Sequence, residues 1–451
     1  MADRNTTQGG ADEVLATPYT DKYNNKITPS RKIQGLVTTW NLLFDQNYEL
    51  QSHSVVMGSI VELPKGDSPT LQLVHPTEKE KMMQFNMNGK SWRRALSIPA
   101  YLRREATLSQ QAFTRDGGIT YWILVDTVLD GNPLNPASGT RLPLASCETY
   151  RMKALVWQDG ELHESICHVI GSVFCGEHLR GNGYAQRMMR ELSKVLRTHQ
   201  MEGGTENQFS VLFSDIGKKF YNKFGWEPFN SSHIAIPCTS SVANHGLPTA
   251  RPLFAEDLEE LCEIDMAAIR QSLKARPKGS RLAVALLPTA EKFQWYHARE
   301  EFVGTELFGK MPKIKGAMVG TELGKRVWCF WTHMWYNSNR AEAEGNTLYI
   351  LRLVVEDGSL ADVAASNQDL EASIAALLAM AQQAGEEWNM EHVEMWNPAA
   401  VTVKAAQRLW PSAKVVHRDV ESIASLQWFP EHHGPMAPKM DWIANEKYGW
   451  C

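Results

Sequence analysis

The chain has 451 residues, which is too long for one ordinary hydrophobic core, so at least two domains are expected. Hydrophobic residues make up 43% and charged residues 22%, as in a soluble globular protein. The net charge of −5 argues against a nucleic-acid-binding protein that depends on overall attraction to phosphates. Seven cysteines without a C-x-x-C pair indicate reduced thiols in a cytoplasmic protein rather than a disulfide framework.

Changes in composition along the chain predict its domain organisation. The N-terminal sequence is polar and resembles neither a secretory signal nor a transit peptide. No apolar run approaches the roughly 20 residues of a membrane span, so no membrane partner is expected. The predicted segments are a loosely ordered tail at 1–30, an N-terminal arm at 31–68, a first domain at 69–240, a linker at 241–252 and a C-terminal domain at 253–451.

The sequence of the first domain predicts three successive strands before its main helix. Thr77 and Glu80 have the spacing of a capping box that opens a helix. The predicted strands are 71–77, 117–128, 148–157, 166–174 and 209–215, and the predicted later helices are 183–199 and 216–226. This order indicates a mixed sheet covered by helices, not a regularly alternating doubly wound fold.

The C-terminal domain repeats a similar order of elements. Its predicted elements are a helix at 258–273, strands at 326–336 and 347–357, a helix at 370–388, a strand at 392–396 and a helix at 399–409. Nothing like R-G-N-G follows the strand at 347–357. We therefore interpret this part as a duplicated fold that has lost its phosphate-binding turn.

The stretch Arg180–Ala185, R-G-N-G-Y-A, lies between a predicted strand and a predicted helix, where phosphate-binding turns occur. A dinucleotide fingerprint requires a third glycine, and that position is Gln186. A nucleotide P-loop is suggested by Gly89-Lys90-Ser91, but its first glycine is replaced by Gln84. Neither of these two nucleotide-binding motifs is therefore present.

The pattern R-x-x-G-x-A before an amphipathic helix resembles the acyl-CoA-binding turn of the GCN5-related N-acetyltransferases, abbreviated GNAT. A second motif, FSVLFSDIGKKFYNKFGWEPF at 209–229, resembles the closing element of the same family. The resemblance covers about 70–240. It implies an α/β (α+β) GNAT fold, with a mixed, mostly antiparallel sheet flanked by helices.

The resemblance also implies that the co-substrate is acetyl-CoA. Backbone amides at a helix N-terminus suit a pyrophosphate, and Gly183 allows the main chain to approach it closely. Main chain at 173–175 would run beside the pantetheine, and Phe220 would pack near the thioester. The implied cofactor-binding residues are Phe174, Cys175, Arg180, Gly181, Asn182, Gly183, Tyr184, Ala185 and Phe220.

Acyl transfer to an amine requires a base for the amine and an acid for the departing thiolate. Tyr221 stands at the family's general-acid position, and the alternative is a buried tyrosine that serves a hydrogen-bond network. His168 is the candidate base, with Glu177 as its rival and a structural histidine as the alternative. Cys175 has no legible His or Asp partner that would make it a nucleophile.

No metal site is predicted from the histidines. The spacing of His163 and His168 is one residue too long for H-E-x-x-H, and Glu431-His432-His433 is typical of a solvated loop.

The whole-chain plan is similar to that of the fungal lysine N6-acetyltransferases. The similar strings are C-E-T-Y-R at 147–151 and N-E-K-Y-G-W-C at 445–451. This resemblance implies a small-molecule amine, the side-chain amine of free L-lysine, as acceptor in lysine breakdown. Two alternatives stay open: a protein lysine acetyltransferase and a non-catalytic acetyl-CoA-binding protein. The carboxylates suggested for an acceptor pocket are Glu177, Asp215, Glu356 and Glu394.

The C-terminal tail at 439–451 carries two tryptophans and a tyrosine, so we expect it to be docked rather than free. Packing between domains would account for this. A sharper hypothesis is that Trp450 or the Cys451 carboxylate reaches the active-site cleft.

Overall fold

The computed structural model describes residues 62–201, 206–238, 246–356, 358 and 367–451. The predicted tail at 1–30 and residues 31–61 of the predicted arm lie outside the described residues. Residues from Glu62 onward form one compact unit.

Within the described residues, the first sheet has nine strands. Its main order is β1 (Leu71–Val74), β2 (Ile119–Asp126), β3 (Ala145–Gln158), β4 (Glu161–Phe174), β5 (Glu206–Ser214), β15 (Ile423–Trp428) and β6 (Glu227–Pro228). Of the two remaining strands, β9 (Leu282–Leu286) pairs with β3, and β16 (Met440–Ile443) pairs with β9. Most neighbours are antiparallel, but β4 and β5 are parallel and are joined through helix α4 (Tyr184–Val195).

The second sheet repeats this arrangement with seven described strands. Its order is β14 (Val416–His417), β7 (Ser232–Pro237), β13 (His392–Trp396), β12 (Thr347–Val355), β11 (Val327–Met334), β10 (Gly316–Val319) and β8 (Ala250–Leu253). Here β12 and β13 are the parallel pair, and α8 (Gln368–Glu387) joins them. The predicted fold class is confirmed, and the common strand order supports the interpretation of the second part as a repeat.

The two halves of the chain exchange strands, which the predicted boundary at 241–252 does not anticipate. Besides β9 and β16, which extend the first sheet from the C-terminal half, two exchanged strands flank the parallel pairs. Strand β7 precedes that boundary yet pairs with β13 in the second sheet. Strand β15 comes from the C-terminal half yet pairs with β5 in the first sheet. Each parallel pair is therefore continued by an antiparallel strand from the other half of the chain, so 69–240 and 253–451 are not separate structural units.

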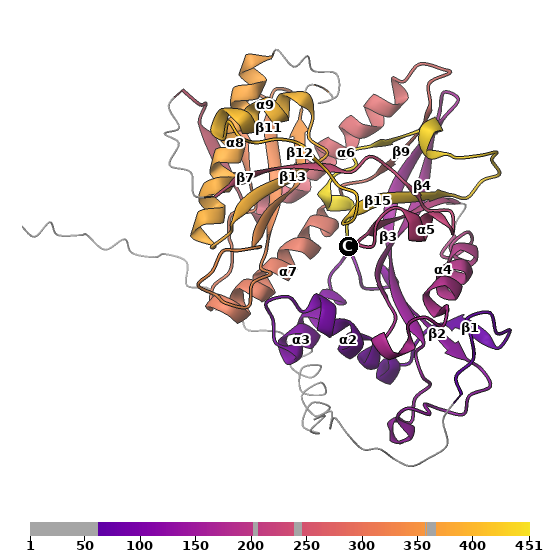
Figure 1. The fold of residues 1–451 in the computed structure, drawn as a ribbon. Coiled ribbons are helices and arrows are strands. Elements are labelled where there is room, and N and C mark those ends of the chain that lie inside the picture. The colour runs from indigo at the N-terminus through magenta and orange to yellow at the C-terminus, as the bar shows by residue number, and fades with distance from the viewer. Residues whose placement is uncertain (1–61, 202–205, 239–245, 357, 359–366) are drawn as a thin grey trace, which may run out of the picture. The chain divides into compact units, whose positions relative to one another are not determined.

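Helices cover the outer faces of both sheets, and α4 lies on the opposite side of the described unit from α8 and α9 (Ala400–Leu409) (Figure 1). The buried side of α4 packs Met188, Met189 and Leu192 against the first sheet. Between the sheets, α6 (Leu258–Lys274) and α7 (Ala290–Phe308) contribute to a core with strands from both.

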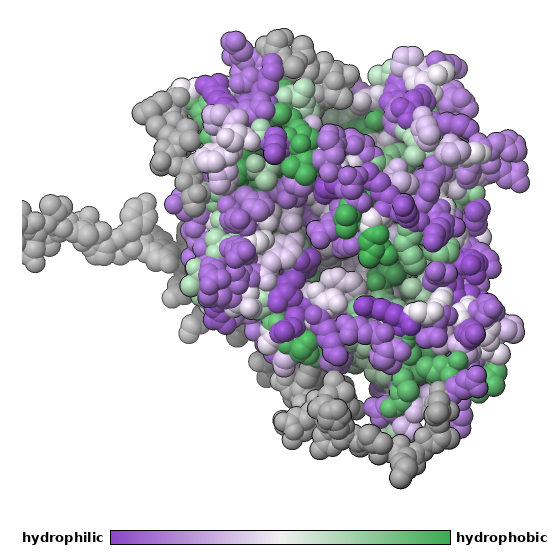
Figure 2. Space-filling view, in the orientation of Figure 1, coloured by the Kyte–Doolittle hydropathy of each residue, from purple (hydrophilic) through white to green (hydrophobic). Residues whose placement is uncertain are grey.

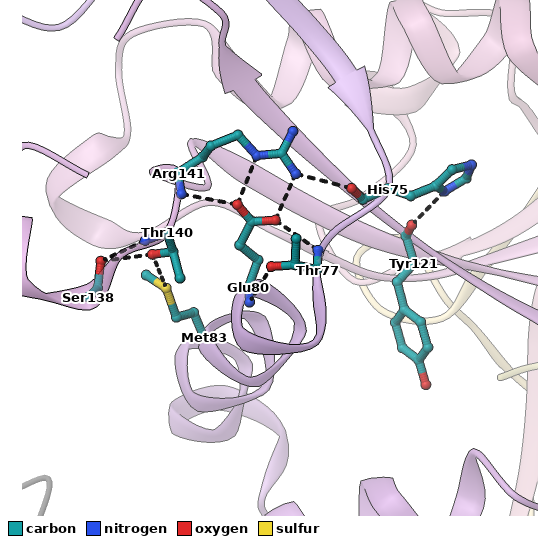
Figure 3. Close-up of polar contacts among 8 residues, drawn as sticks. All are labelled: His75, Thr77, Glu80, Met83, Tyr121, Ser138, Thr140 and Arg141. Carbon is teal, nitrogen blue, oxygen red and sulfur yellow. Dashed lines mark hydrogen bonds and ion pairs between the residues drawn. The ribbon is translucent and has the colours of Figure 1, made fainter. Parts of the chain in front are cut away.

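Helix α2 (Glu78–Trp92) begins at the predicted capping box and leads to α3 (Ile98–Leu108). Thr77 accepts a hydrogen bond from the Glu80 amide, and Glu80 accepts one from the Thr77 amide (Figure 3). Arg141 donates to both carboxylate oxygens of Glu80 at 2.8 and 2.7 Å. Burial would raise the pKa of Glu80, but these hydrogen bonds hold it at about 2. The ion pair therefore anchors α2 to the loop before β3.

Candidate active site

The predicted phosphate-binding turn is present between β4 and α4. Gly181 and Gly183 both have φ near +84°, a conformation that glycine adopts without steric cost. Gly183 caps α4 without any side-chain hydrogen bond, so the first backbone amides of the helix stay available. These amides face a pocket of about 500 Å³ lined by Arg180, Gly181, Asn182, Gly183, Tyr184 and Ala185. The pocket therefore has the donor arrangement that a pyrophosphate requires.

Additional cationic residues line the same pocket, and the sequence did not single them out. They are Lys65, Arg187 and Arg190. Gly66 donates a hydrogen bond to Asn182 at 2.7 Å, and a Cβ at this position would lie only 2.6 Å from the Gly183 carbonyl carbon. The end of the predicted arm thus packs on the turn. The only earlier signal was its turn sequence P-K-G-D, which carries no functional meaning by itself.

A substitution at Gly181 tests the cradle. A Cβ at Gly181 meets no atom within 4 Å, so the added group would occupy the pocket rather than clash with protein. We expect Gly181→Val to raise the KM for acetyl-CoA by about tenfold or more through loss of phosphate hydrogen bonds. Gly139→Val is the matched control, because Gly139 also has positive φ and open surroundings but lies outside the pocket. Equal KM values for the two variants would contradict a phosphate role.

Strands β4 and β5 separate next to this pocket. Their pairing ends at Ile170 and Leu212, although β4 continues to Phe174 and β5 to Ser214. Main-chain groups of β4 beyond Ile170 therefore have no partner on the β5 side. Such a gap can accept an extended chain as if it were an additional strand, and residues 173 and 174 belong to this unpaired end of β4.

The other predicted cofactor-binding residues lie around the gap. Cys175 and Phe220 line the pocket, and the Cys175 thiol donates to the Leu144 carbonyl at 3.3 Å. Arg180 donates to the Cys175 carbonyl at 3.2 Å and lies over the Phe174 ring. Burial raises the pKa of the Cys175 thiol, which agrees with its reading as a non-nucleophile.

Tyr221 projects from the short helix α5 (Lys219–Asn222) into the core beneath α4. Its side chain is buried, and among the described residues its hydroxyl makes no hydrogen bond. Burial raises the pKa of Tyr221 above that of a free tyrosine, so the hydroxyl keeps its proton at neutral pH. A protonated hydroxyl without a partner fits a proton donor better than a member of a structural network.

His168 is not placed as a base requires. It lies in the paired part of β4, opposite Ser210, and its side chain is fully buried. Nε2 contacts Gln200 at 2.9 Å and Nδ1 contacts Asn207 at 2.9 Å, so both ring nitrogens are occupied. Burial lowers the pKa of His168 to about 4. The structure therefore corrects the sequence-based assignment and favours the structural alternative.

We expect His168→Gln to keep kcat within about twofold and to lower the free energy of unfolding by about 1–3 kcal/mol, through the lost buried hydrogen bonds. A hundredfold lower kcat in fully folded protein would restore His168 as the base. Because its pKa is lower in the folded state, protonation favours unfolding. Wild-type stability should therefore fall as the pH drops from about 6.5 towards 4, and chemical denaturation across this range measures it.

A better-placed base is Glu148 in β3. It is buried, faces Gly171 of β4 at the start of the gap, and accepts a hydrogen bond from Tyr150 at 2.9 Å. Burial, with a contribution from Glu105, raises the pKa of Glu148 to about 7. A carboxylate with this pKa can accept a proton near neutral pH.

A β-bulge at this point directs Glu148 towards the gap. Ser146 pairs with Phe174 and Glu148 with Gly171, so Ser172 and Val173 together oppose Cys147. Such bulges often re-aim side chains next to active sites. The available sequence signal was C-E-T-Y-R, where a carboxylate and a tyrosine alternate on one face of a strand.

Glu148 and Tyr221 lie on opposite faces of the first sheet. Cys147 belongs to the same core as Tyr221, whereas Tyr150 belongs to the core between the two sheets. Since successive side chains alternate across a strand, Glu148 shares the Tyr150 side. The candidate base and the candidate acid thus lie on opposite faces of the first sheet.

The C-terminal tail is docked, as expected, on the Glu148 side. Lys292 donates to the Trp450 carbonyl at 2.9 Å, and Tyr448 is fully buried. A Cβ at Gly171 would lie 3.6 Å from the Cys451 carbonyl oxygen. The face in Figure 2 is mostly hydrophilic and hollowed near its centre, and Figure 1, in the same orientation, marks the chain end next to that hollow.

The four carboxylates suggested from the sequence have different surroundings. Glu177 and Asp215 are exposed. Glu356 forms an ion pair with Arg326 at 2.7 Å, and Glu394 accepts a hydrogen bond from Trp396. Among the described residues, no group of three or more His, Cys, Asp or Glu side chains could hold a metal ion.

Comparisons with known proteins agree with this geometry. A family model described as the LYC1 GNAT-like C-terminal domain matches residues 233–451, beginning at the exchanged strand β7. A lysine acetyltransferase of Yarrowia lipolytica (strain CLIB 122 / E 150) is 24% identical over 238 residues. These two matches support placing the chain in the GNAT superfamily. The match to the Yarrowia protein covers 44% of this chain and 58% of that protein, less than two thirds of the relative's length.

Other proteins are similar to this chain at lower sequence identity. The uncharacterized protein YGR111W of Saccharomyces cerevisiae (strain ATCC 204508 / S288c) is 20% identical over 399 residues, 80% of this chain and 93% of that protein. A GCN5-related N-acetyltransferase structure from Anabaena variabilis ATCC 29413 has 12% identity and a TM-score of 0.44, covering 79% and 72% of the two chains. A Saccharomyces cerevisiae N-myristoyltransferase with bound myristoyl-CoA has 10% identity and a TM-score of 0.46, covering 89% and 94%. No residue role is carried over from structures this distant.

None of the described helices has both the length and the apolar character that a membrane span needs.

Proposed function

We propose that this protein transfers an acetyl group from acetyl-CoA to a primary amine, and that the amine is the side-chain amine of free L-lysine. The observation that carries the proposal is the uncapped N-terminus of α4 at a cationic pocket, next to the unpaired end of β4. The pocket fits a pyrophosphate, and the strand gap fits the pantetheine chain. The Yarrowia relative, named a lysine acetyltransferase, supports the choice of acceptor.

Each proposed residue role follows from position and protonation state. When bound, acetyl-CoA supplies the acetyl group and a thiolate leaving group. Glu148 takes the proton that the amine nitrogen loses, and Tyr221 gives its hydroxyl proton to the departing sulfur. The amides of Gly181–Ala185, with Arg180, hold the phosphates. The seven cysteines are free thiols, which supports a cytoplasmic enzyme of lysine breakdown as part of the same proposal.

The test is thiol release from acetyl-CoA with L-lysine, ornithine, a polyamine and a lysine-containing peptide as parallel acceptors. Saturable turnover with lysine, and a product acetylated on the side-chain nitrogen, is the expected result. Turnover with the peptide alone would instead indicate a protein lysine acetyltransferase. Acetyl-CoA binding without turnover of any acceptor would indicate a non-catalytic binding protein.

A further inference from the structure

A second, narrow cavity lies between the helices before β2 and the second sheet. Its polar lining consists of Arg93, Arg94, Arg104, Arg299 and His333, and none of the described residues that line it is acidic. Arg104 is buried, Arg94 and Arg299 are half-buried and Arg93 is exposed. Guanidinium groups gathered around one small space repel one another, and the partial burial of three of them costs free energy unless an anion compensates them. The cavity therefore requires an explanation that hydrophobic packing does not supply.

The arginines are only partly neutralised by the protein. Arg104 is buried and donates to Glu105 at 2.9 and 2.5 Å. Arg299, from α7, makes no ion pair or hydrogen bond with any described residue; it lies over the Trp450 ring at 5.4 Å. Arg94 lies over the Tyr336 ring at 3.9 Å, and its buried Nε has no hydrogen-bond partner in the described structure. Donors of two arginines thus remain available for an anion.

His333 contributes a fixed polar group to the same cavity. Its Nδ1 contacts the buried carboxylate of Glu300 at 2.8 Å, and Lys315 contacts the other oxygen of that carboxylate at 2.7 Å. The side chain of His333 is buried, and its Nε2 has no hydrogen-bond partner among the described residues. A buried ring nitrogen held in place from behind, and unpartnered in front, is typical of a binding site rather than of a satisfied core.

The cavity and the candidate base belong to one electrostatic neighbourhood. Burial raises the pKa of Tyr101 on α3, and Glu105, Arg104, Glu148 and Arg299 all act on the same hydroxyl. Arg104 likewise acts on Glu148. Burial is the largest cause that lowers the pKa of Arg299, to about 9, and repulsion from Arg104 and Arg94 lowers it further. Contacts of the C-terminal tail give the same neighbourhood, because Arg299 lies over the Trp450 ring and the next residue, Cys451, lies beside Gly171, which is opposite Glu148.

The cavity itself, of about 10 Å³, has room for only about one water molecule. We propose that the arginines around it bind the α-carboxylate of a free amino acid whose side-chain amine is presented to Glu148. Arginine binds carboxylates through paired N–H donors, and Arg299 and Arg94 have donors free for this purpose. A lysine residue within a peptide has no α-carboxylate, so the cavity selects free amino acids over proteins. The inference rests on the proposed function, because it assigns the acceptor of the same active site.

The test compares acceptors with and without the carboxylate. Wild-type kcat/KM for L-lysine is expected to exceed that for 1,5-diaminopentane by at least about 100-fold, since a site built around a polar group rejects analogues that lack it. Arg299→Gln should lower kcat/KM for L-lysine by about tenfold or more, mainly through KM, and leave 1,5-diaminopentane and the KM for acetyl-CoA unchanged. Arg94→Gln should act in the same direction. Arg103→Gln is the control, since Arg103 neighbours Arg104 but pairs with Glu306 outside the cavity.

A binding measurement separates this inference from the proposed function. Calorimetric titration with L-norleucine, which has the α-carboxylate but no side-chain amine, should show binding to wild type in the presence of CoA, and at least tenfold weaker binding to Arg299→Gln. Binding of norleucine without turnover of any amine would keep the cavity assignment and reject the acetyltransferase proposal. Turnover of lysine and diaminopentane with similar kcat/KM, or norleucine affinity unaffected by Arg299→Gln, would overturn the cavity assignment.

Discussion

Glu148→Gln is expected to lower kcat for the amine acceptor by at least about 100-fold, the usual contribution of a general base. The amide keeps an oxygen that can accept the Tyr150 hydrogen bond but cannot take a proton from an ammonium or amine nitrogen. The KM for acetyl-CoA should stay close to wild type, because Glu148 lies outside the phosphate pocket. Steady-state kinetics with varied acetyl-CoA and saturating acceptor measure both values.

The pH dependence gives an independent check on Glu148. A base acts in its ionised form, so kcat of wild type should rise with pH and level off above about 7, the pKa that burial gives this carboxyl. The residual kcat of Glu148→Gln should no longer rise with pH in this range. The stability effect has the opposite sign: a raised folded-state pKa means that ionisation favours unfolding. Glu148→Gln should therefore be at least as stable as wild type at pH 8.

The matched control is Glu161→Gln, an exposed position at the beginning of β4. It removes one carboxylate from the same sheet and should leave kcat unchanged. A Glu148→Gln enzyme with kcat within threefold of wild type, and with the same pH profile, would show that another group deprotonates the amine.

The local parts of the site could be predicted from the sequence. Gly181 and Gly183 stand directly before α4 in the sequence, and glycine is the residue type that adopts the positive φ of this turn without steric cost. The apolar spacing of Met188, Met189 and Leu192 likewise fixes which face of α4 is buried. The motif around Tyr221 is equally local. These features depend on neighbours within a few residues, so no tertiary information is needed to recognise them.

The groups assembled from distant segments could not be predicted. His168 was a reasonable base by its strand position, but its partners Gln200 and Asn207 come from other elements, and only the fold shows that both ring nitrogens are occupied. Arg94 and Arg299 meet across two hundred residues of sequence. The exchange of strands β7 and β15 could not be predicted for the same reason. Alternating hydrophobic and polar residues identify a strand but do not show which sheet the strand joins.

Tyr221→Phe is expected to lower kcat by at least about 100-fold and to leave the KM for acetyl-CoA nearly unchanged, since it removes one proton donor and retains the ring. The hydroxyl makes no hydrogen bond with described residues, so its loss leaves no protein group unsatisfied and should not lower the melting temperature. An unchanged kcat would remove the acid role.

Loss of packing near the thioester end could also slow the reaction, and Phe224→Leu distinguishes this effect. Phe224 contacts Phe220 with ring centroids 5.5 Å apart, in the same aromatic cluster as Tyr221. Its truncation should lower the melting temperature and keep kcat, whereas Tyr221→Phe should do the reverse. If Phe224→Leu lowered kcat as strongly as Tyr221→Phe, the cluster would act by shape alone. A selective loss in Tyr221→Phe, combined with the pH effect at Glu148, would place proton donor and proton acceptor on opposite faces of one strand gap. The departing sulfur would then receive its proton on one face of the sheet, and the amine nitrogen would lose its proton on the other.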